Sequence, residues 1–203
     1  MSFGDGQSRL FLEPLAGKTA AFRLADRPSN IKFAIAILKL FGASRRGCRV
    51  LDLDAFYSSN LQTLVTSPSQ ESLSSTELTI PEPGSDVDGV LSDLFLTGYD
   101  KPLLIDSVNT LYQLISSRNP RAATRKFTFF VSALSSWARS NGGPALASIY
   151  DRRPEYYRKP SRSLADAFDV SVSVSTKDYG LAFKCERGTA WRGGTFFLAS
   201  DGR

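Results

Sequence analysis

The chain has 203 residues, of which 42% are hydrophobic and 22% charged, and its formal net charge is +5. These values are typical of one domain with a substantial core, and they exclude a disulfide-stapled mini-protein and a wholly disordered chain. The absence of histidine excludes imidazole acid–base catalysis, Ser/His/Asp and Cys/His nucleophilic systems and histidine-ligated zinc. Cys48 and Cys185 are too few for a four-cysteine metal site. They could form one disulfide, but a reduced intracellular chain is the simpler interpretation.

The sequence gives no indication of a membrane partner. Its first residues lack the apolar run of a signal peptide, and no apolar stretch reaches the roughly 18 residues of a membrane span. The mildly basic balance permits a phosphate-bearing partner without requiring one.

Apolar periodicity and turn residues divide the chain into strands and helices. We expect strands at 19–24, 49–54, 77–80, 102–106, 145–150, 168–175, 181–186 and 195–199, and helices at 31–41, 86–97, 108–116 and 121–140, with a short turn or helix at 163–167. Residues 58–85 are rich in Ser, Thr and Pro and are expected to be weakly ordered. Strands that alternate with helices and then give way to hairpins predict a single domain, 1–203, with a mixed α/β sheet.

The first strand–turn–helix unit has the layout of a phosphate-binding loop, which requires G-x-x-x-x-G-K-[ST]. The equivalent stretch, residues 26–33, reads DRPSNIKF. Lys32 stands at the lysine place, but Asp26 and Ile31 replace both glycines and Phe33 replaces the hydroxyl residue. The alternative interpretation is a tight turn with a solvated lysine.

Four further segments occur in an order that extends this similarity. Residues 101–107 (KPLLIDS) form an apolar strand that ends in an Asp, and residues 50–54 (VLDLD) form a strand that presents carboxylates. Residues 163–170 and 183–188 follow, and together they resemble the terminal strands of one ATPase family. From about residue 17 to residue 198 the chain resembles the RecA-type ATPase core of the RadA and KaiC proteins, with a degenerate phosphate loop and no intact Walker A motif.

The resemblance implies a three-layer α/β fold, with a mostly parallel sheet between helices and an antiparallel extension at the C-terminus. It also implies rings or filaments in which nucleotide lies between subunits. By this resemblance Asp54 is a vestigial water-activating carboxylate and Asp106 a vestigial magnesium-side carboxylate. Lys32 and Asp106 are then cofactor-binding positions, and Lys184 and Arg187 reach toward the nucleotide of a neighbouring subunit.

These positions also have ordinary structural interpretations. Asp54 and Asp106 can be strand-end acids, and Lys184 and Arg187 can be plain hairpin charges. Because positioned charge dominates phosphoryl transfer, the loss of the glycines and the hydroxyl predicts at most weak ATP hydrolysis. We therefore expect no tightly bound cofactor and no metal site. Weak binding of ATP with magnesium remains compatible with the sequence.

The stretch from residue 151 to residue 162 mixes cations with aromatic residues. Its members with predicted nucleic-acid contacts are Arg152, Arg153, Tyr156, Tyr157, Arg158, Lys159 and Arg162. Cations for phosphates beside aromatics for bases are typical of single-stranded nucleic-acid binding. In the resembling family a mobile loop at this place contacts DNA in the recombinases. The alternative is a solvated loop whose tyrosines pack on the domain.

The leading hypothesis is a catalytically degenerate RecA-like accessory subunit in DNA recombination and repair. It would bind single-stranded DNA or RNA and assemble with itself or with an active relative. One alternative is an Elongator-type RecA-like subunit that contacts tRNA, and another is a KaiC-like protein-assembly scaffold without nucleic acid.

Overall fold

The computed structural model describes residues 5–25, 27–43, 47–60, 76–81, 87–96, 101–151, 161–178 and 180–199. Among these residues no helix is long and apolar enough to cross a membrane.

One sheet runs through the described part of the chain, in the order β3-β2-β4-β5-β1-β6-β7-β8. Its strands are β1 (Thr19–Leu24), β2 (Cys48–Asp52), β3 (Thr76–Thr79), β4 (Leu103–Asp106), β5 (Ala145–Tyr150), β6 (Val170–Lys177), β7 (Gly180–Arg187) and β8 (Thr195–Ala199). The strands from β3 to β6 in this order are parallel, whereas β7 and β8 are antiparallel additions at one edge. The expected sheet with a C-terminal antiparallel extension is therefore confirmed.

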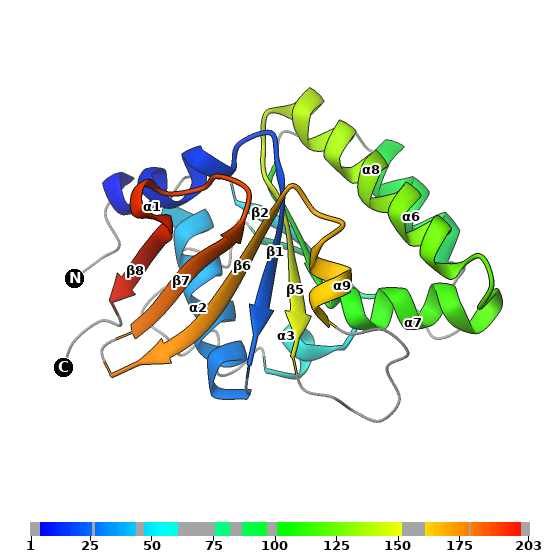
Figure 1. Ribbon diagram of the computed structural model, residues 1–203, viewed down its shortest axis with the longest axis horizontal. Helices are drawn as coiled ribbons and strands as arrows, with labels where there is room; N and C mark the ends of the chain where they lie inside the picture. Colours follow the sequence, from blue (N-terminus) through cyan, green and yellow to red (C-terminus); the bar gives the residue numbers. More distant parts are fainter. Residues whose placement is uncertain are drawn as a thin grey trace.

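Helices cover both faces of the sheet (Figure 1). The α-helices are α1 (Asp5–Leu12), α2 (Arg27–Ala43), α3 (Phe56–Ser59), α6 (Val87–Leu96), α7 (Val108–Arg118), α8 (Ala123–Asn141) and α9 (Ser161–Ala165), with 3-10 turns η1 (Glu13–Leu15) and η2 (Arg192–Gly194). The helices α1 and α2 pack on one face, and α6, α7, α8 and α9 lie on the other.

Each face of the sheet has its own apolar core. The core beneath α1 and α2 centres on aromatic rings. The ring centroids of Phe11, Phe22 and Phe183 lie within 6.1 Å of one another. Trp191 joins this group, with its ring centroid 5.2 Å from that of Phe11. The second core receives the apolar stripe of α8, including the fully buried Phe127. Because parallel strands buried on both faces have no solvated side, β1, β4 and β5 are apolar almost throughout.

The structure differs from the sequence-based expectations at three helices. The second helix begins at Arg27, four residues before the expected start at residue 31, so most of the expected turn is helical. Phe129, an aromatic residue that its side-chain type favours for a core, is 75% exposed on α8. Helix α1 was not expected, and it is held by the buried Phe11.

The remaining predicted elements agree with the structure to within about two residues at most ends. The predicted strands at 19–24, 145–150 and 195–199 match β1, β5 and β8 without any shift. Most of the stretch expected to be weakly ordered, including residues 61–75, lies outside the described residues. Within it, β3 confirms the short strand near residue 77.

Candidate functional site

Three carboxylates gather where β2 and β4 end. The two strands are parallel neighbours, and their register places Asp52 opposite Asp106. Two residues after Asp52, Asp54 lies in the turn that follows β2. Because the carboxyl ends of parallel strands form the usual ligand-binding edge of an α/β sheet, this cluster is the candidate site.

Asp54 is hydrogen-bonded to the first turn of α7. Its Oδ2 accepts a hydrogen bond of 2.6 Å from the Ser107 hydroxyl, and its Oδ1 accepts one from the Thr110 hydroxyl. Ser107 is also the N-cap of α7, where its side chain accepts from the Thr110 backbone N–H. Both Asp54 oxygens are thus engaged with residues of its own chain.

Asp52 is occupied in a similar way by the short helix α3. Its two oxygens accept from the backbone N–H groups of Phe56 at 2.8 Å and Ser58 at 2.9 Å. A carboxylate at this position satisfies amides at the start of a helix that would otherwise lack partners. Asp52, which is 1% exposed, is therefore a buried capping residue.

Asp106 is the most enclosed member of the cluster. Its Oδ1 accepts hydrogen bonds from the Ser148 hydroxyl and from the Tyr150 hydroxyl, the latter at 2.6 Å. Its Oδ2 is buried with no hydrogen-bond partner among the described residues. Burial raises the pKa of Asp106 to about 7, and the charges of Asp54 and Asp52 act in the same direction.

Two tyrosines complete the enclosure around Asp106. Burial raises the pKa of Tyr150, and the neighbouring Asp106 carboxylate raises it further. Burial also raises the pKa of Tyr57, which is 3% exposed, with Asp106 again contributing. Both phenols are therefore neutral over the whole physiological range, and that of Tyr150 donates to Asp106.

The three carboxylates do not by themselves form a divalent-metal site. Within the described part of the chain, no three Asp, Glu, Cys or His side chains are placed to hold one. Asp52 and Asp54 are already satisfied by amides and hydroxyls, and a metal would have to displace these contacts.

The region expected to resemble a phosphate loop is helical. Helix α2 begins three residues after the last residue of β1, and its backbone is helical through Lys32 and Phe33. Helical hydrogen bonds occupy the N–H groups from Ile31 onward, so these groups cannot surround a polyphosphate. Phe33 is buried and packs on Phe22 with ring centroids 5.2 Å apart. Lys32 is exposed on α2, and its role as a cofactor-binding residue stays a prediction.

The two cations expected to reach a neighbouring subunit lie at different positions along β7. Lys184 is exposed and pairs across the sheet with Ser173. Arg187 lies at the end of β7, opposite Ser171, which places it near the amino ends of the parallel strands. Its guanidinium donates to the Asp166 carbonyl at the end of α9. Within one chain, Arg187 and the Asp54–Asp106 cluster therefore lie at opposite edges of the sheet.

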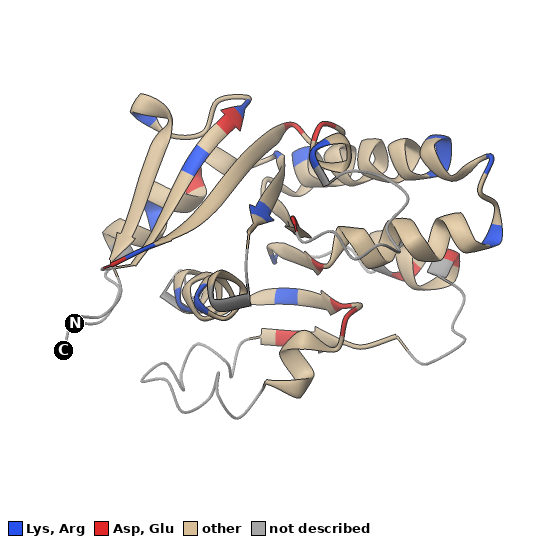
Figure 2. Ribbon diagram, turned by 60° about the horizontal axis from the view of Figure 1, so that its bottom comes forward, with Lys and Arg blue, Asp and Glu red and all other residues tan. Residues whose placement is uncertain are grey.

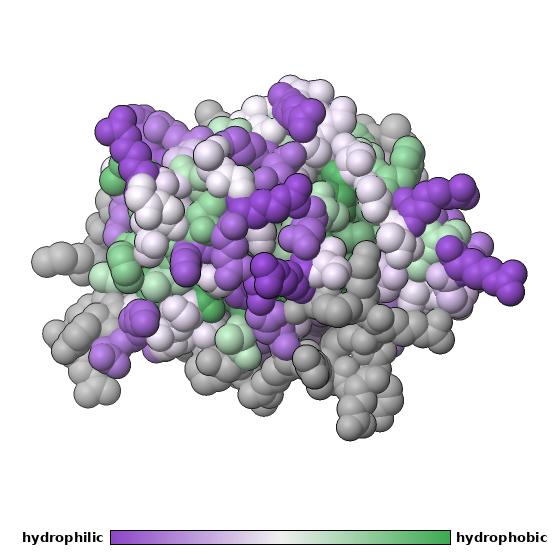
Figure 3. Space-filling model, viewed as in Figure 1, coloured by the Kyte–Doolittle hydropathy of each residue, from purple (hydrophilic) through white to green (hydrophobic). Residues whose placement is uncertain are grey.

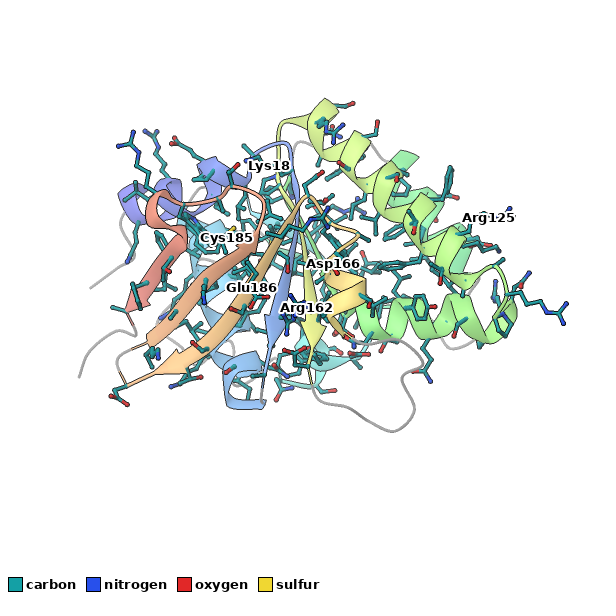
Figure 4. All side chains as sticks on the ribbon, viewed as in Figure 1. Lys18, Arg125, Arg162, Asp166, Cys185 and Glu186 are labelled. Carbon is teal, nitrogen blue, oxygen red and sulfur yellow. The ribbon has the colours of Figure 1, made fainter. Side chains whose placement is uncertain are left out.

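The predicted nucleic-acid segment lies mostly outside the described residues. This is the case for Arg152, Arg153, Tyr156, Tyr157, Arg158 and Lys159. The described ends of the segment are Asp151, which pairs with Arg23 at 2.8 Å, and the exposed Arg162 at α9. In Figure 4, Arg162, Asp166 and Glu186 lie on one side of the sheet, beside the open face of β6 and β7. Arg23 also pairs with Glu186 at 2.5 Å.

Sequence reasoning missed the hydroxyl groups that surround the carboxylates. Ser148 is a polar residue inside an otherwise apolar strand, and Ser107 directly follows the strand-end Asp106. A buried hydroxyl in a central strand requires a partner, so Ser148 carried a usable signal. Tyr57 and Tyr150 carried none, because their approach to Asp106 depends on tertiary packing.

No protein-family model matches the chain, and no curated protein matches it. Among solved structures, the crystal structure of the RadB recombinase superposes with a TM-score of 0.65 and 15% sequence identity. The match covers 91% of this chain and 88% of that one. The fold is RecA-like. The RecA-like architecture expected from the sequence is thus confirmed at the level of fold.

Proposed function

We propose that this chain is a catalytically degenerate RecA-like accessory subunit with at most weak ATP hydrolysis, which binds nucleic acid through residues 152–162 and assembles with itself or with an active relative in recombination and repair. The loss of ATP hydrolysis is best supported by the hydrogen bonds that the strand-end carboxylates make within the chain. Asp54 is held by two hydroxyls and Asp52 by two amides of α3, so both carboxylates are engaged in local structure, which supports a loss of catalytic function.

The start of α2 supports the same proposal. Phosphoryl transfer depends on amides, a lysine and a hydroxyl that surround the phosphates. Here the helix begins at Arg27, and the residue at the hydroxyl place, Phe33, is part of the aromatic core. The RecA-like scaffold is therefore combined with a packing residue, Phe33, at the place of the magnesium-binding hydroxyl.

Nucleotide binding is tested by thermal unfolding with and without magnesium-ATP. A ligand present at 100 times its Kd would stabilise the protein by about 2.7 kcal/mol. We expect no change in melting temperature and phosphate release at the level of buffer alone. A clear rise in melting temperature would make the chain a nucleotide-binding protein and contradict this part of the proposal.

Nucleic-acid binding is tested by fluorescence anisotropy with labelled single-stranded DNA and RNA. We expect binding that weakens with salt and weakens further in Arg152→Ala/Arg153→Ala. Equal binding by this variant and the wild type would remove the segment from the proposal.

Assembly is measured separately, by size-exclusion chromatography with light scattering and by recovery of partners from cells. A monomer at all concentrations, with no partner recovered from cells, would contradict the assembly part of the proposal.

A further inference from the structure

The net positive charge of the molecule comes from one segment, which includes the helical hairpin of α7 and α8. Residues 107–150 contain five of the 25 Lys and Arg residues and none of the 20 Asp and Glu residues. The rest of the chain is therefore balanced, with 20 residues of each sign. The whole formal charge of +5 resides in α7, α8, β5 and their connections.

Four of these five cations cluster at the corner where α7 meets α8. Arg118 lies in the last turn of α7, Arg121 in the connecting turn, and Arg125 and Lys126 in the first turn of α8. Figure 2 shows Lys and Arg positions in blue where two helices join at one end of the molecule, and Figure 3 shows long hydrophilic side chains that project at the end where α7 and α8 meet. In Figure 4 Arg125 points away from the body of the domain.

The nearest described acid only partly balances this corner. Lys126 approaches Asp88 of α6 at 3.9 Å, between two exposed side chains. Arg121 and Arg125 are exposed and make no ion pair with any described carboxylate. Cations in the first turn also oppose the helix dipole of α8, so folding alone does not favour them there.

An exposed aromatic ring continues the cationic surface. Phe129 follows Arg125 by four residues and therefore lies beside it on the same face of α8. At 75% exposure it is the most exposed large hydrophobic side chain in the described part of the chain. Its neighbours Phe127 and Phe130 are buried, so the ring is outside the core that the rest of the helix forms.

We infer that Arg121, Arg125 and Phe129 form a binding surface for single-stranded nucleic acid, separate from residues 152–162. Arginines neutralise and hydrogen-bond phosphates, and an exposed ring provides a stacking surface for a base. An acidic peptide would use the charges but not the planar ring, which is why the combination favours a nucleic-acid strand. This inference rests on the nucleic-acid binding in the proposed function and adds a second point of contact.

The test is anisotropy of labelled 30-nucleotide DNA and RNA strands across a salt series. For Arg121→Gln/Arg125→Gln we expect roughly tenfold weaker binding and a log–log salt slope flatter by about 1.4, the value for two lost phosphate contacts. For Phe129→Ala we expect at least about fivefold weaker binding with an unchanged slope, because stacking is not ionic. Glutamine is a good helix former, and Phe129 is exposed, so both variants keep the fold.

Two matched variants control for general effects. Lys177→Gln/Arg192→Gln removes two exposed charges elsewhere, and Phe197→Ala removes a ring that is 65% exposed on β8. The inference is overturned if the hairpin variants bind within twofold of the wild type, or if the controls lose as much affinity.

The Arg152→Ala/Arg153→Ala variant separates this inference from the proposed function. If it alone loses binding, the hairpin surface is wrong and the proposed segment stands. If only the hairpin variants lose binding, the segment is wrong and the hairpin surface stands. A wild-type protein that binds neither strand overturns both.

Discussion

The Ser107 hydroxyl donates a hydrogen bond of 2.6 Å to the Asp54 carboxylate, and this contact joins the turn after β2 to the N-cap of α7. Ser107 directly follows Asp106 in the chain, across a cis peptide bond. One side chain therefore connects the position expected to hold a water-activating carboxylate with the strand expected to face magnesium.

Asp54→Ala should reduce stability and leave ATP hydrolysis unchanged. The substitution removes the acceptor of the Ser107 and Thr110 hydroxyls, and we expect a loss of about 1–3 kcal/mol in the free energy of unfolding. Urea denaturation measures this loss, and Asp178→Ala, in the turn between β6 and β7, is the control for an exposed acid. A measurable wild-type ATPase that Asp54→Ala abolishes would show that the carboxylate is catalytic.

Stability should fall as the pH rises through the range in which Asp106 titrates. The folded-state pKa of Asp106 is raised from 3.8 to about 7, mainly by burial, so the folded protein retains a proton that the unfolded chain releases. Its contribution is thus fully present below pH 4, declines as the pH rises and levels off above pH 7.

Asp106→Asn isolates this effect, because its side-chain oxygen can still accept from Ser148 and Tyr150. Relative to the wild type, the variant should gain roughly 2–4 kcal/mol between pH 5 and pH 8. The measurement is the difference between the two proteins in urea unfolding at each pH. A difference that does not change with pH would show that Asp106 is ionised in both states.

Asp169→Asn should destabilise the protein at neutral pH. Asp169 Oδ2 accepts hydrogen bonds from the Thr19 N–H, the Thr19 hydroxyl and the Ser135 hydroxyl, at 2.8–2.9 Å. Burial would raise the pKa of Asp169, but these bonds and the charge of Arg139 outweigh it and lower the pKa.

The stabilisation by Asp169 is therefore present at neutral pH and disappears as acid protonates the carboxylate. We expect a loss of roughly 1–3 kcal/mol at pH 7 for the variant, which shrinks toward low pH. The measurement is thermal or urea unfolding of both proteins at pH 7 and pH 3. An equal loss at both values would contradict the role of the charge.

The two thiols should react at very different rates. Cys48 is fully buried in β2, and burial raises its pKa to about 12, whereas Cys185 is partly exposed on β7. Because the thiolate is the reactive species, a thiol reagent should modify one site quickly and the second only on unfolding. Cys185→Ser should remove the fast phase, and a fast phase that persists in this variant would contradict the assignment.

The fold could be predicted from the sequence because its strands are short apolar runs separated by turn residues. The strand at 145–150 is a short apolar run next to turn residues, and the helix that contains Phe127 has an apolar stripe with helical spacing. The start of α2 was not accessible, because Pro28 and Ser29 are equally suited to a turn and to the first turn of a helix. In the folded protein these residues begin the helix.

The candidate site was only partly accessible. Asp54 and Asp106 could be identified from their places at strand ends, but their partners could not. The hydrogen bonds from Ser148 and Tyr150 depend on β5 lying next to β4, and no local pattern encodes that pairing. Phe129 is a case in which residue type misleads. An aromatic residue within an amphipathic helix is expected in a core, but this one faces solvent.

The central place of β1 has a consequence for biosynthesis. This strand leaves the ribosome first but pairs with β5 and β6, so Thr19 meets Ala145 and Ala20 meets Val170. At about 5–20 residues per second, the nascent chain needs roughly 6–24 s after β1 before β5 is translated. During that interval β1 lacks both of its native neighbour strands, so this apolar segment cannot reach its native pairing until the second half of the protein emerges.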